Sequence, residues 1–249
     1  MPSDRGNTLQ LPGLADRLAF VSGHRGGIGR AIAQLLEAQG CGVVGLDLPD
    51  FDLAAVETLE ARLADLVARH GAPRILVNCA GTTLLGSIPD TSLADLQKVM
   101  AVNFTAPFLL MKAVLPGMVA AGGGSIVNVA SDQALVGKPL SAAYGASKGA
   151  LAQLTRSAAI DFGRHRVRVN CIAPGSTDTA MLREVMEASQ QFRSLYPPPP
   201  GVGFRLDSVP LARLAQPSEI AAAAVFLASE AASFITGVVL PVDGGVTAA

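Results

Sequence analysis

The sequence has no tryptophan, only two tyrosines and only 16% charged residues, whereas 50% of its 249 residues are apolar. This apolar fraction is enough for a sizeable core, and the length fits one α/β domain. The formal net charge is -1, and the longest basic group is Arg164, His165, Arg166 and Arg168. Because nucleic acids are bound mainly by clusters of Lys and Arg, we expect no nucleic-acid partner.

Segments that insert into membranes or direct export are also missing. The apolar stretches are interrupted by Lys, Pro, Asn or Gly before they reach the length of a bilayer span. The start, MPSDRGNTLQLPGLADR, has Asp and Pro where a signal peptide has a charged region and then an apolar one. The three cysteines, Cys41, Cys79 and Cys171, lack the spacing of metal ligands. We therefore expect a cytoplasmic protein with free thiols, no membrane contact and no bound metal.

Short apolar runs alternate with helical patterns along the chain. The runs are rich in β-branched residues and predict strands at 18–22, 42–46, 74–78, 125–129, 167–173 and 237–242. Helical patterns lie between them, at 28–39, 53–69, 93–120, 143–162 and 217–227. Strands that are apolar on both faces belong in a covered parallel sheet. The order predicts a single Rossmann-type α/β domain over 1–249, a doubly wound parallel sheet with helices on both faces.

One segment, 181–210, breaks this alternation. It contains YPPPPGVGF, and four consecutive prolines cannot continue a helix or a central strand. We therefore expect an irregular loop. Because a long loop inside a compact domain is usually functional, this loop is predicted to cover the substrate.

A glycine-rich turn follows the first predicted strand. Gly23, Gly27 and Gly29 permit a tight turn and leave the N-terminus of the next helix free to donate N–H groups to a phosphate. Asp47 ends the second strand, 24 residues after Gly23, where a carboxylate accepts hydrogen bonds from an adenosine ribose. A carboxylate there repels the extra phosphate of NADP, so NAD is the predicted cofactor. Arg25 is the contrary evidence, because a basic residue in this turn can reach that phosphate.

A tyrosine and a lysine lie four residues apart in the fourth predicted helix. Tyr144 and Lys148 share one face of that helix, so the ammonium group can lower the pKa of the tyrosine and make it a general base. Ser131 follows the fourth predicted strand, at the sheet edge where open α/β folds bind ligands. Asn103 lies inside a long apolar helix, where a buried amide needs a reason. These four residues are the candidate catalytic group.

Together these motifs resemble the short-chain dehydrogenase/reductase family over nearly the full chain. The cofactor motif of the family is matched by SGHRGGIG, its N-N-A-G motif by NCAG, the segment after its sixth strand by PGSTDT, and its last strand by VDGG. The resemblance implies that Asn103, Ser131, Tyr144 and Lys148 are catalytic. It implies cofactor contacts from Ser22, Gly23, Arg25, Gly27, Ile28, Gly29, Asp47, Asp52, Leu53, Asn78, Ala80, Gly81, Tyr144, Lys148, Pro174, Gly175, Thr177 and Thr179. It also implies a homotetramer formed through the helices at 93–120 and 143–162.

The family resemblance implies a distinct role for each catalytic residue. Tyr144 would remove the hydroxyl proton while a hydride leaves the same carbon for NAD, and Ser131 would orient the substrate oxygen. Lys148 would also hold the nicotinamide ribose, and Asn103 would position a water that connects Lys148 to solvent.

The sequence departs from the family pattern after the second predicted strand. Only four residues separate Asp47 from Asp52, where the family usually has a helix and its third strand. Asp52 and Leu53 still match the pair that contacts adenine. We therefore expect a more open adenine end of the cofactor site.

Two segments carry a finer resemblance. NVASDQALVGKPLSAAYGASKGAL and APGSTDTAMLREV are similar to the group that oxidises the C3 hydroxyl of 2,3-dihydro-2,3-dihydroxybenzoate in siderophore pathways. Asp132 is one feature that marks this group, and the resemblance implies that it contacts the substrate. Lys138 falls where the group has an arginine and Arg183 matches another basic position, so either is a candidate to pair with the substrate carboxylate. Another arginine of the group is replaced by Leu84. This implies either that other residues bind the substrate carboxylate or that the substrate is different.

Three other functions stay open. The sequence does not separate the first substrate from trans-2,3-dihydro-3-hydroxyanthranilate, which gives 3-hydroxyanthranilate in antibiotic biosynthesis. An NADPH-dependent 3-oxoacyl carrier-protein ketoreductase would need a basic residue at or beside Asp47 and a basic docking patch, and only Arg25 and the group at 164–168 are present. A non-catalytic NAD-sensing scaffold would tolerate loss of the four catalytic residues, all of which are present.

Overall fold

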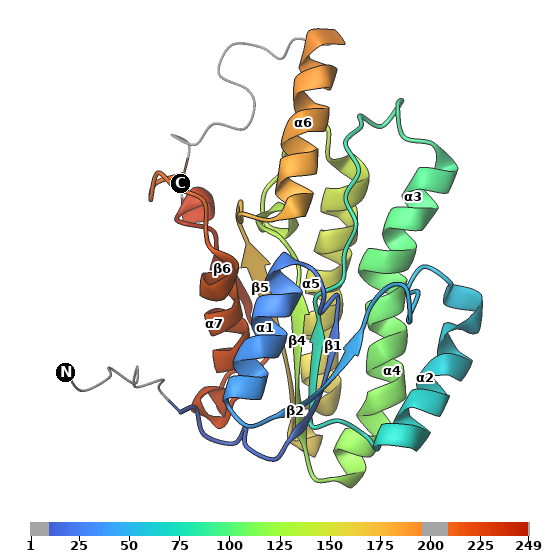
Figure 1. Ribbon diagram of the computed structural model, residues 1–249, viewed down its shortest axis with the longest axis vertical. Helices are drawn as coiled ribbons and strands as arrows, with labels where there is room; N and C mark the ends of the chain where they lie inside the picture. Colours follow the sequence, from blue (N-terminus) through green and yellow to red (C-terminus); the bar gives the residue numbers. More distant parts are fainter. Residues whose placement is uncertain (1–9, 196–208, 249) are drawn as a thin grey trace, which may run out of the picture.

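A computed structural model describes residues 10–195 and 209–248 of the protein. Its centre is a parallel sheet of six strands in the order β2-β1-β3-β4-β5-β6 (Figure 1). The strands are β1 (Leu18–Ser22), β2 (Gly42–Leu46), β3 (Ile75–Asn78), β4 (Gly124–Val129), β5 (Val167–Pro174) and β6 (Val239–Val242). The predicted Rossmann-type sheet is thereby confirmed, because each predicted strand is present and the order changes direction between β1 and β3.

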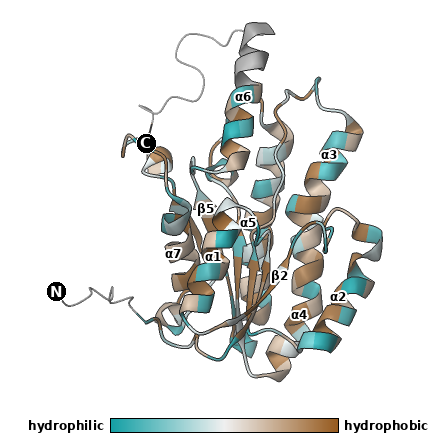
Figure 2. Ribbon diagram, in the orientation of Figure 1, coloured by the Kyte–Doolittle hydropathy of each residue, from teal (hydrophilic) through white to brown (hydrophobic). Residues whose placement is uncertain are grey.

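Helices cover both faces of the sheet, as predicted. On one face lie α1 (Gly27–Ala38) and α7 (Pro217–Ala228), and on the other lie α2 (Val56–His70), α4 (Ala106–Ala120) and α5 (Ala142–Phe162). Successive strand residues alternate between the two cores: Phe20 packs toward α2 and α4, and Val21 packs toward α1. Figure 2 shows the strands as mostly hydrophobic, with hydrophilic residues on the outer side of α2. Burial on both faces explains the continuous apolar runs of the sequence.

The helical run before β4 has three parts: α3 (Leu93–Met100), a π-helical turn (Ala101–Thr105) and α4. By length and composition alone this run is long and apolar enough to cross a membrane. However, Leu110, Val114 and Met118 are fully buried in the core on the α2 side of the sheet. Packing within the fold therefore accounts for the apolar character of α4.

The expectation of an irregular loop over 181–210 is wrong for its first part. Ala180–Leu195 forms α6, which projects above the carboxyl ends of the strands (Figure 1). Thr179 begins the helix, because its hydroxyl oxygen accepts a hydrogen bond from the Leu182 N–H at 3.2 Å. The four prolines come after the last residue of α6 and lie outside the described residues.

A short connection replaces an edge strand beyond β2. The chain runs directly from β2 to α2, and Phe51 and Leu53 anchor it in the core. The Arg62 guanidinium lies 4.4 Å from the centroid of the Phe51 ring and donates a hydrogen bond to the Asp50 carbonyl at 2.6 Å. Arg25 forms an ion pair with the Asp50 side chain. The connection is thus fastened by two buried side chains and two arginines.

The apolar anchor of this connection can be tested by Phe51→Ala. The substitution is expected to lower the free energy of unfolding by about 3 kcal/mol, because it removes a buried ring and leaves a cavity. Chemical denaturation measures the change. The control is Phe234→Ala, which removes a fully exposed ring and should change stability by less than about 0.5 kcal/mol. Equal, small effects of the two substitutions would contradict the anchoring role.

Candidate active site

A cavity of about 840 Å³ lies at the carboxyl ends of the strands, where open α/β sheets bind ligands. Five strands deliver residues to it, and α6 lines one part of it. The residues that directly follow or end these strands in the lining include Gly23, Asp47, Cys79, Ala130 and Pro174. Nearly all of the residues that the sequence analysis assigned to cofactor and substrate line this cavity.

Close backbone approaches shape the glycine-rich turn. A Cβ atom on Gly29 would lie 2.0 Å from the Gly23 carbonyl oxygen, and one on Gly27 would lie 2.5 Å from a methyl carbon of Thr179. Gly23 has a φ of +71° and lies against the Ala80 backbone. Only glycine fits these positions, so the N-terminus of α1 opens toward the cavity. The turn therefore fits the pyrophosphate of a dinucleotide.

Asp47 lines the cavity at its predicted adenosine end. One of its carboxylate oxygens accepts a hydrogen bond from the Arg25 N–H at 2.9 Å, and the other accepts from the Leu48 N–H at 2.8 Å. The Arg25 guanidinium pairs with Asp50 and donates to the Leu48 carbonyl at 2.9 Å. Arg25, the evidence against NAD in the sequence, is thus already engaged with protein oxygens. Asp52 and Leu53 complete this end of the lining.

Ser22 and Asn78 do not line the cavity, and their expected contact with the cofactor stays a prediction. The Ser22 hydroxyl accepts hydrogen bonds from the N–H groups of Cys79 and Ala80 at 3.0 and 3.1 Å. The Asn78 amide donates to the Asn128 side-chain oxygen at 2.8 Å. Both residues therefore support the strand ends that carry the lining residues.

Three predicted catalytic residues meet in the cavity. Tyr144 and Lys148 come from α5, and Ser131 follows β4. Lys148 is 3% exposed; its ammonium donates to the Val129 carbonyl at 2.9 Å and lies 5.7 Å from the centroid of the Tyr144 ring. The arrangement brings a hydroxyl, a phenol and an ammonium group to one place.

Burial dominates the ionisation of these groups. It raises the pKa of Tyr144 to about 12, and the hydrogen bond with Ser131 opposes this while Asp132 adds to it. Burial also lowers the pKa of Lys148 to about 8. The predicted lowering of the Tyr144 pKa by Lys148 is therefore wrong for the protein chain alone. The physical reason is that desolvation of the buried phenol is the largest influence on its pKa, while the Lys148 ammonium is bonded to the Val129 carbonyl.

Asn103 is fully buried in the π-helical turn and does not line the cavity. Its side-chain oxygen accepts from the Thr82 N–H at 2.8 Å, and its amide donates to the Thr82 carbonyl at 2.9 Å and to the Ser147 hydroxyl at 3.0 Å. Asn103 thus ties the segment after Gly81 to the α5 residue that precedes Lys148. The π-helical turn, a geometry common at functional sites, presents this amide inward. Its expected water-positioning role stays a prediction.

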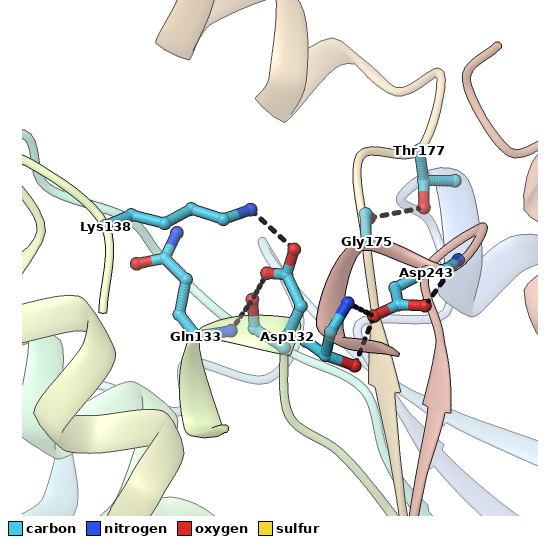
Figure 3. A network of polar contacts seen from close by, with 9 residues as sticks. Asp132, Gln133, Lys138, Gly175, Thr177 and Asp243 are labelled. Carbon is cyan, nitrogen blue, oxygen red and sulfur yellow. Dashed lines mark hydrogen bonds and ion pairs between the residues drawn. The ribbon is translucent and has the colours of Figure 1, made fainter. Parts of the chain in front are cut away.

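Of the residues expected to bind substrate, Asp132 and Lys138 line the cavity and Arg183 does not. Lys138 and Asp132 form an ion pair at 2.5 Å, and the Ser131 hydroxyl donates to the other Asp132 oxygen at 3.0 Å (Figure 3). Arg183 pairs with Asp178 at 2.6 Å. The expected contact of Arg183 with substrate therefore has no support in the structure.

The predicted nicotinamide end lies beside β5 and β6. The Thr177 hydroxyl donates to the Gly175 carbonyl at 3.1 Å, and a Cβ atom on Gly175 would lie 2.8 Å from the Asp243 backbone. Asp243 in turn accepts hydrogen bonds from the N–H groups of Gly245 and Thr247, both at 2.9 Å (Figure 3). The VDGG segment thus braces the segment that carries Pro174, Gly175, Thr177 and Thr179.

Sequence reasoning missed several lining residues. Four of them are apolar residues of α6, and others come from α3, from the segment after β3 and from the turn after β4. The missed residues include Ala180, Met181, Leu182, Val185, Lys98, Thr82, Thr83, Leu85 and Gln133. The spacing of Met181, Leu182 and Val185 on one helix side was available in the sequence. The nearby prolines led to a loop assignment instead.

Comparison with known families and proteins agrees with these motifs. Residues 49–247 match the family of short-chain reductases described as enoyl-(acyl carrier protein) reductase. A 2,5-dichloro-2,5-cyclohexadiene-1,4-diol dehydrogenase of Sphingobium indicum is 36% identical over 256 residues, with 94% of this chain and 98% of that protein covered. A trans-4-hydroxycyclohexanecarboxylate dehydrogenase of Sinomonas cyclohexanicum is 33% identical, with 94% of each chain covered. A galactitol 2-dehydrogenase of Cereibacter sphaeroides is 39% identical, with 92% and 94% covered.

Solved structures show the same fold. A ligand-free aldohexose dehydrogenase of Thermoplasma acidophilum superposes with a TM-score of 0.84 at 29% identity, covering 96% of this chain and 97% of that one. A Beutenbergia cavernae protein assigned as an NAD(P)-dependent gluconate 5-dehydrogenase, with NADP bound at low occupancy, has a TM-score of 0.85 at 32% identity, with 95% and 98% covered.

The family match covers most of the chain, and relatives above 30% identity cover nearly all of it. The cavity, the glycine-rich turn and the group of Ser131, Tyr144 and Lys148 agree with that match. The protein therefore belongs to the short-chain dehydrogenase/reductase family, whose members are oxidoreductases that bind NAD or NADP.

Proposed function

We propose that the protein is an NAD-dependent dehydrogenase that oxidises a secondary hydroxyl on a cyclohexadiene ring. The observation that carries this proposal is the meeting of Ser131, Tyr144 and Lys148 in a cavity whose other end fits a dinucleotide. Relatives named for a cyclohexadiene diol and for hydroxycyclohexanecarboxylates support a cyclic alcohol as substrate. The specific substrate we propose is of the 2,3-dihydro-2,3-dihydroxybenzoate type, oxidised at C3 in siderophore or antibiotic biosynthesis.

The cavity residues have separate tasks in this reaction. Tyr144 takes the proton of the substrate hydroxyl, and Ser131 orients the oxygen that carries it. In this proposal Lys148, whose ammonium lies 5.7 Å from the centroid of the Tyr144 ring, holds a ribose hydroxyl of the cofactor. Bound NAD would supply the hydride acceptor for the carbon that bears the hydroxyl, and a positive charge at the site. The ketone formed from a cyclohexadiene diol tautomerises to an aromatic ring, which favours oxidation over reduction.

Asp47 and Arg25 support NAD over NADP. The Asp47 carboxylate lies where it would repel a phosphate on the adenosine ribose, and Arg25 is bound to Asp50 and to the Leu48 carbonyl. The related structure with NADP shows that the fold also accepts the phosphorylated cofactor.

The proposed assembly is a cytoplasmic homotetramer. Phe108 on α4 and Ile160 on α5 are large apolar residues that are 46% and 81% exposed, which supports contacts through these helices. The three cysteines are free thiols, which fits a reducing compartment. Light scattering of the purified protein measures the assembly, and a monomeric mass would contradict the tetramer.

Tyr144→Phe tests the chemistry. It removes the proton acceptor while leaving the ring in place, so turnover should fall by about a hundredfold or more, whereas NAD binding should persist. The assay follows NADH absorbance and the aromatic product with 2,3-dihydro-2,3-dihydroxybenzoate, and separately with trans-2,3-dihydro-3-hydroxyanthranilate. Retained turnover in the variant would exclude Tyr144 as the base.

Two substitutions at the adenosine end test cofactor choice. Asp47→Asn should raise the NADP-to-NAD ratio of kcat/KM by about tenfold, which corresponds to relief of about 1.4 kcal/mol of repulsion. Asp50→Asn should raise the same ratio, because it frees Arg25 to bind the phosphate. Calorimetric binding of NAD and NADP gives a readout that does not depend on turnover. A preference of the wild-type protein for NADP would refute the role given to Asp47.

A further inference from the structure

The turn after β4 places an ion pair between the partly exposed Lys138 and the buried Asp132 directly beside Ser131. We propose that Asp132 and Lys138 are a positioning pair that controls the proton of Ser131 and the charge seen by Tyr144, rather than a clamp for a substrate carboxylate. The inference rests on the proposed dehydrogenase function and deepens it. It assigns to Lys138 a role in every turnover, whatever the charge of the substrate.

The geometry links the three residues in a chain of hydrogen bonds. One Asp132 oxygen accepts from the Ser131 hydroxyl at 3.0 Å, and the other accepts from the Lys138 ammonium at 2.5 Å. The Asp132 side chain is 3% exposed, whereas that of Lys138 is 32% exposed. Figure 3 shows Lys138 reaching across the turn toward Asp132. A carboxylate buried this deeply needs a counter-ion, and Lys138 supplies it.

The ion pair determines what the Ser131 hydroxyl can do. A serine hydroxyl has one proton and two acceptor sites. Here the oxygen accepts from the Gln133 N–H at 3.2 Å, and the single proton has two competing acceptors, Asp132 at 3.0 Å and the Tyr144 oxygen. The Lys138 ammonium donates a hydrogen bond to the same carboxylate and offsets part of its negative charge. The hydrogen bond from Ser131 to Asp132 is therefore weaker than it would be without Lys138. Ser131 is then able to turn its proton toward the substrate oxygen as negative charge develops there.

The same pair affects the general base. The charged or titratable groups that face Tyr144 are Asp132 from the turn after β4, Cys79 from the segment after β3, and Lys148 from α5. The negative charge of Asp132 disfavours a second negative charge on Tyr144 and raises its pKa. Lys138 offsets that charge. Loss of Lys138 should therefore raise the pKa of Tyr144, and loss of the Asp132 charge should lower it.

A carboxylate clamp and a positioning pair predict different kinetics for Lys138→Met. If Lys138 only held a carboxylate, KM would rise for a carboxylated ring alcohol and would not change for an uncharged cyclic diol. If Lys138 positions Ser131, kcat should fall for both substrates. Because deprotonated Tyr144 is the active form in oxidation, the pH at which activity rises should also move upward, by about one unit.

The experiment compares wild type with Lys138→Met, Asp132→Asn, the double variant and Lys138→Arg, all with NAD. The expected pH profile is shifted upward in Lys138→Met and downward in Asp132→Asn and in the double variant, and Lys138→Arg should restore the wild-type profile. The matched control is Lys112→Met, which removes an exposed ion pair with Glu60 and should change neither kcat nor the profile. A rise of KM for the carboxylated substrate alone, with an unchanged profile, would overturn the proposal.

A second readout does not need turnover. The chain has no tryptophan and only two tyrosines, so in a Tyr196→Phe background the ultraviolet absorbance of tyrosinate reports Tyr144 alone. With NAD present, Tyr144 should ionise at the lowest pH in Asp132→Asn, at a higher pH in the parent, and at the highest pH in Lys138→Met. Circular dichroism at each pH confirms that the protein is folded.

The two readouts separate the possible failures. If the wild-type protein turns over no ring alcohol, the proposed function fails, and the order of ionisation still tests the pair. If that order is reversed, or if the three proteins ionise at the same pH, the positioning role fails while the proposed function stands.

Discussion

The close approach of three backbone segments beside β1 is the constraint on which the site depends. Gly23 lies against the segment after β3, Gly27 against Thr179 after β5, and Gly29 against Gly23 itself. A Cβ atom at Gly23 or Gly29 would meet backbone atoms that cannot move without shifting a segment, and one at Gly27 would meet the Thr179 side chain. The glycine-rich turn therefore sets the distance between the phosphate end and the nicotinamide end of the cavity.

Buried polar groups supply the chemistry within this frame. Lys148, Asp132 and Asn103 are each almost completely buried, and each is satisfied by a specific partner: the Val129 carbonyl, Lys138 and the backbone of Thr82. Burying any of these groups without a hydrogen-bond or ion-pair partner would lower the stability of the fold, so their partners fix their positions. The fixed positions bring the serine, the tyrosine and the lysine to one place, and they also make the ionisation of Tyr144 sensitive to the charge of Asp132.

The family motifs predicted about half of the cavity lining. Local sequence patterns predicted the strands and the helices on both faces, because burial on one or both sides leaves a periodic apolar signal. They failed for α6, because the four prolines that follow it in the sequence led to the prediction of a loop instead of a helix. They also failed where a side chain's partner lies in another part of the fold. The support that Ser22 gives to the segment after β3 depends on strand neighbours, and the pairing of Lys138 with Asp132 depends on the path of a turn. Motif spacing cannot specify either contact.

The central claim is that the cavity transfers hydrogen from a ring carbon of a cyclic alcohol to NAD. The most direct measurement uses 2,3-dihydro-2,3-dihydroxybenzoate with deuterium at C3 and follows the label by mass spectrometry. We expect the deuterium in the NADH formed, together with the aromatic product. Absence of transfer from this and other ring alcohols, combined with NADPH-dependent reduction of an oxoacyl thioester, would contradict the claim.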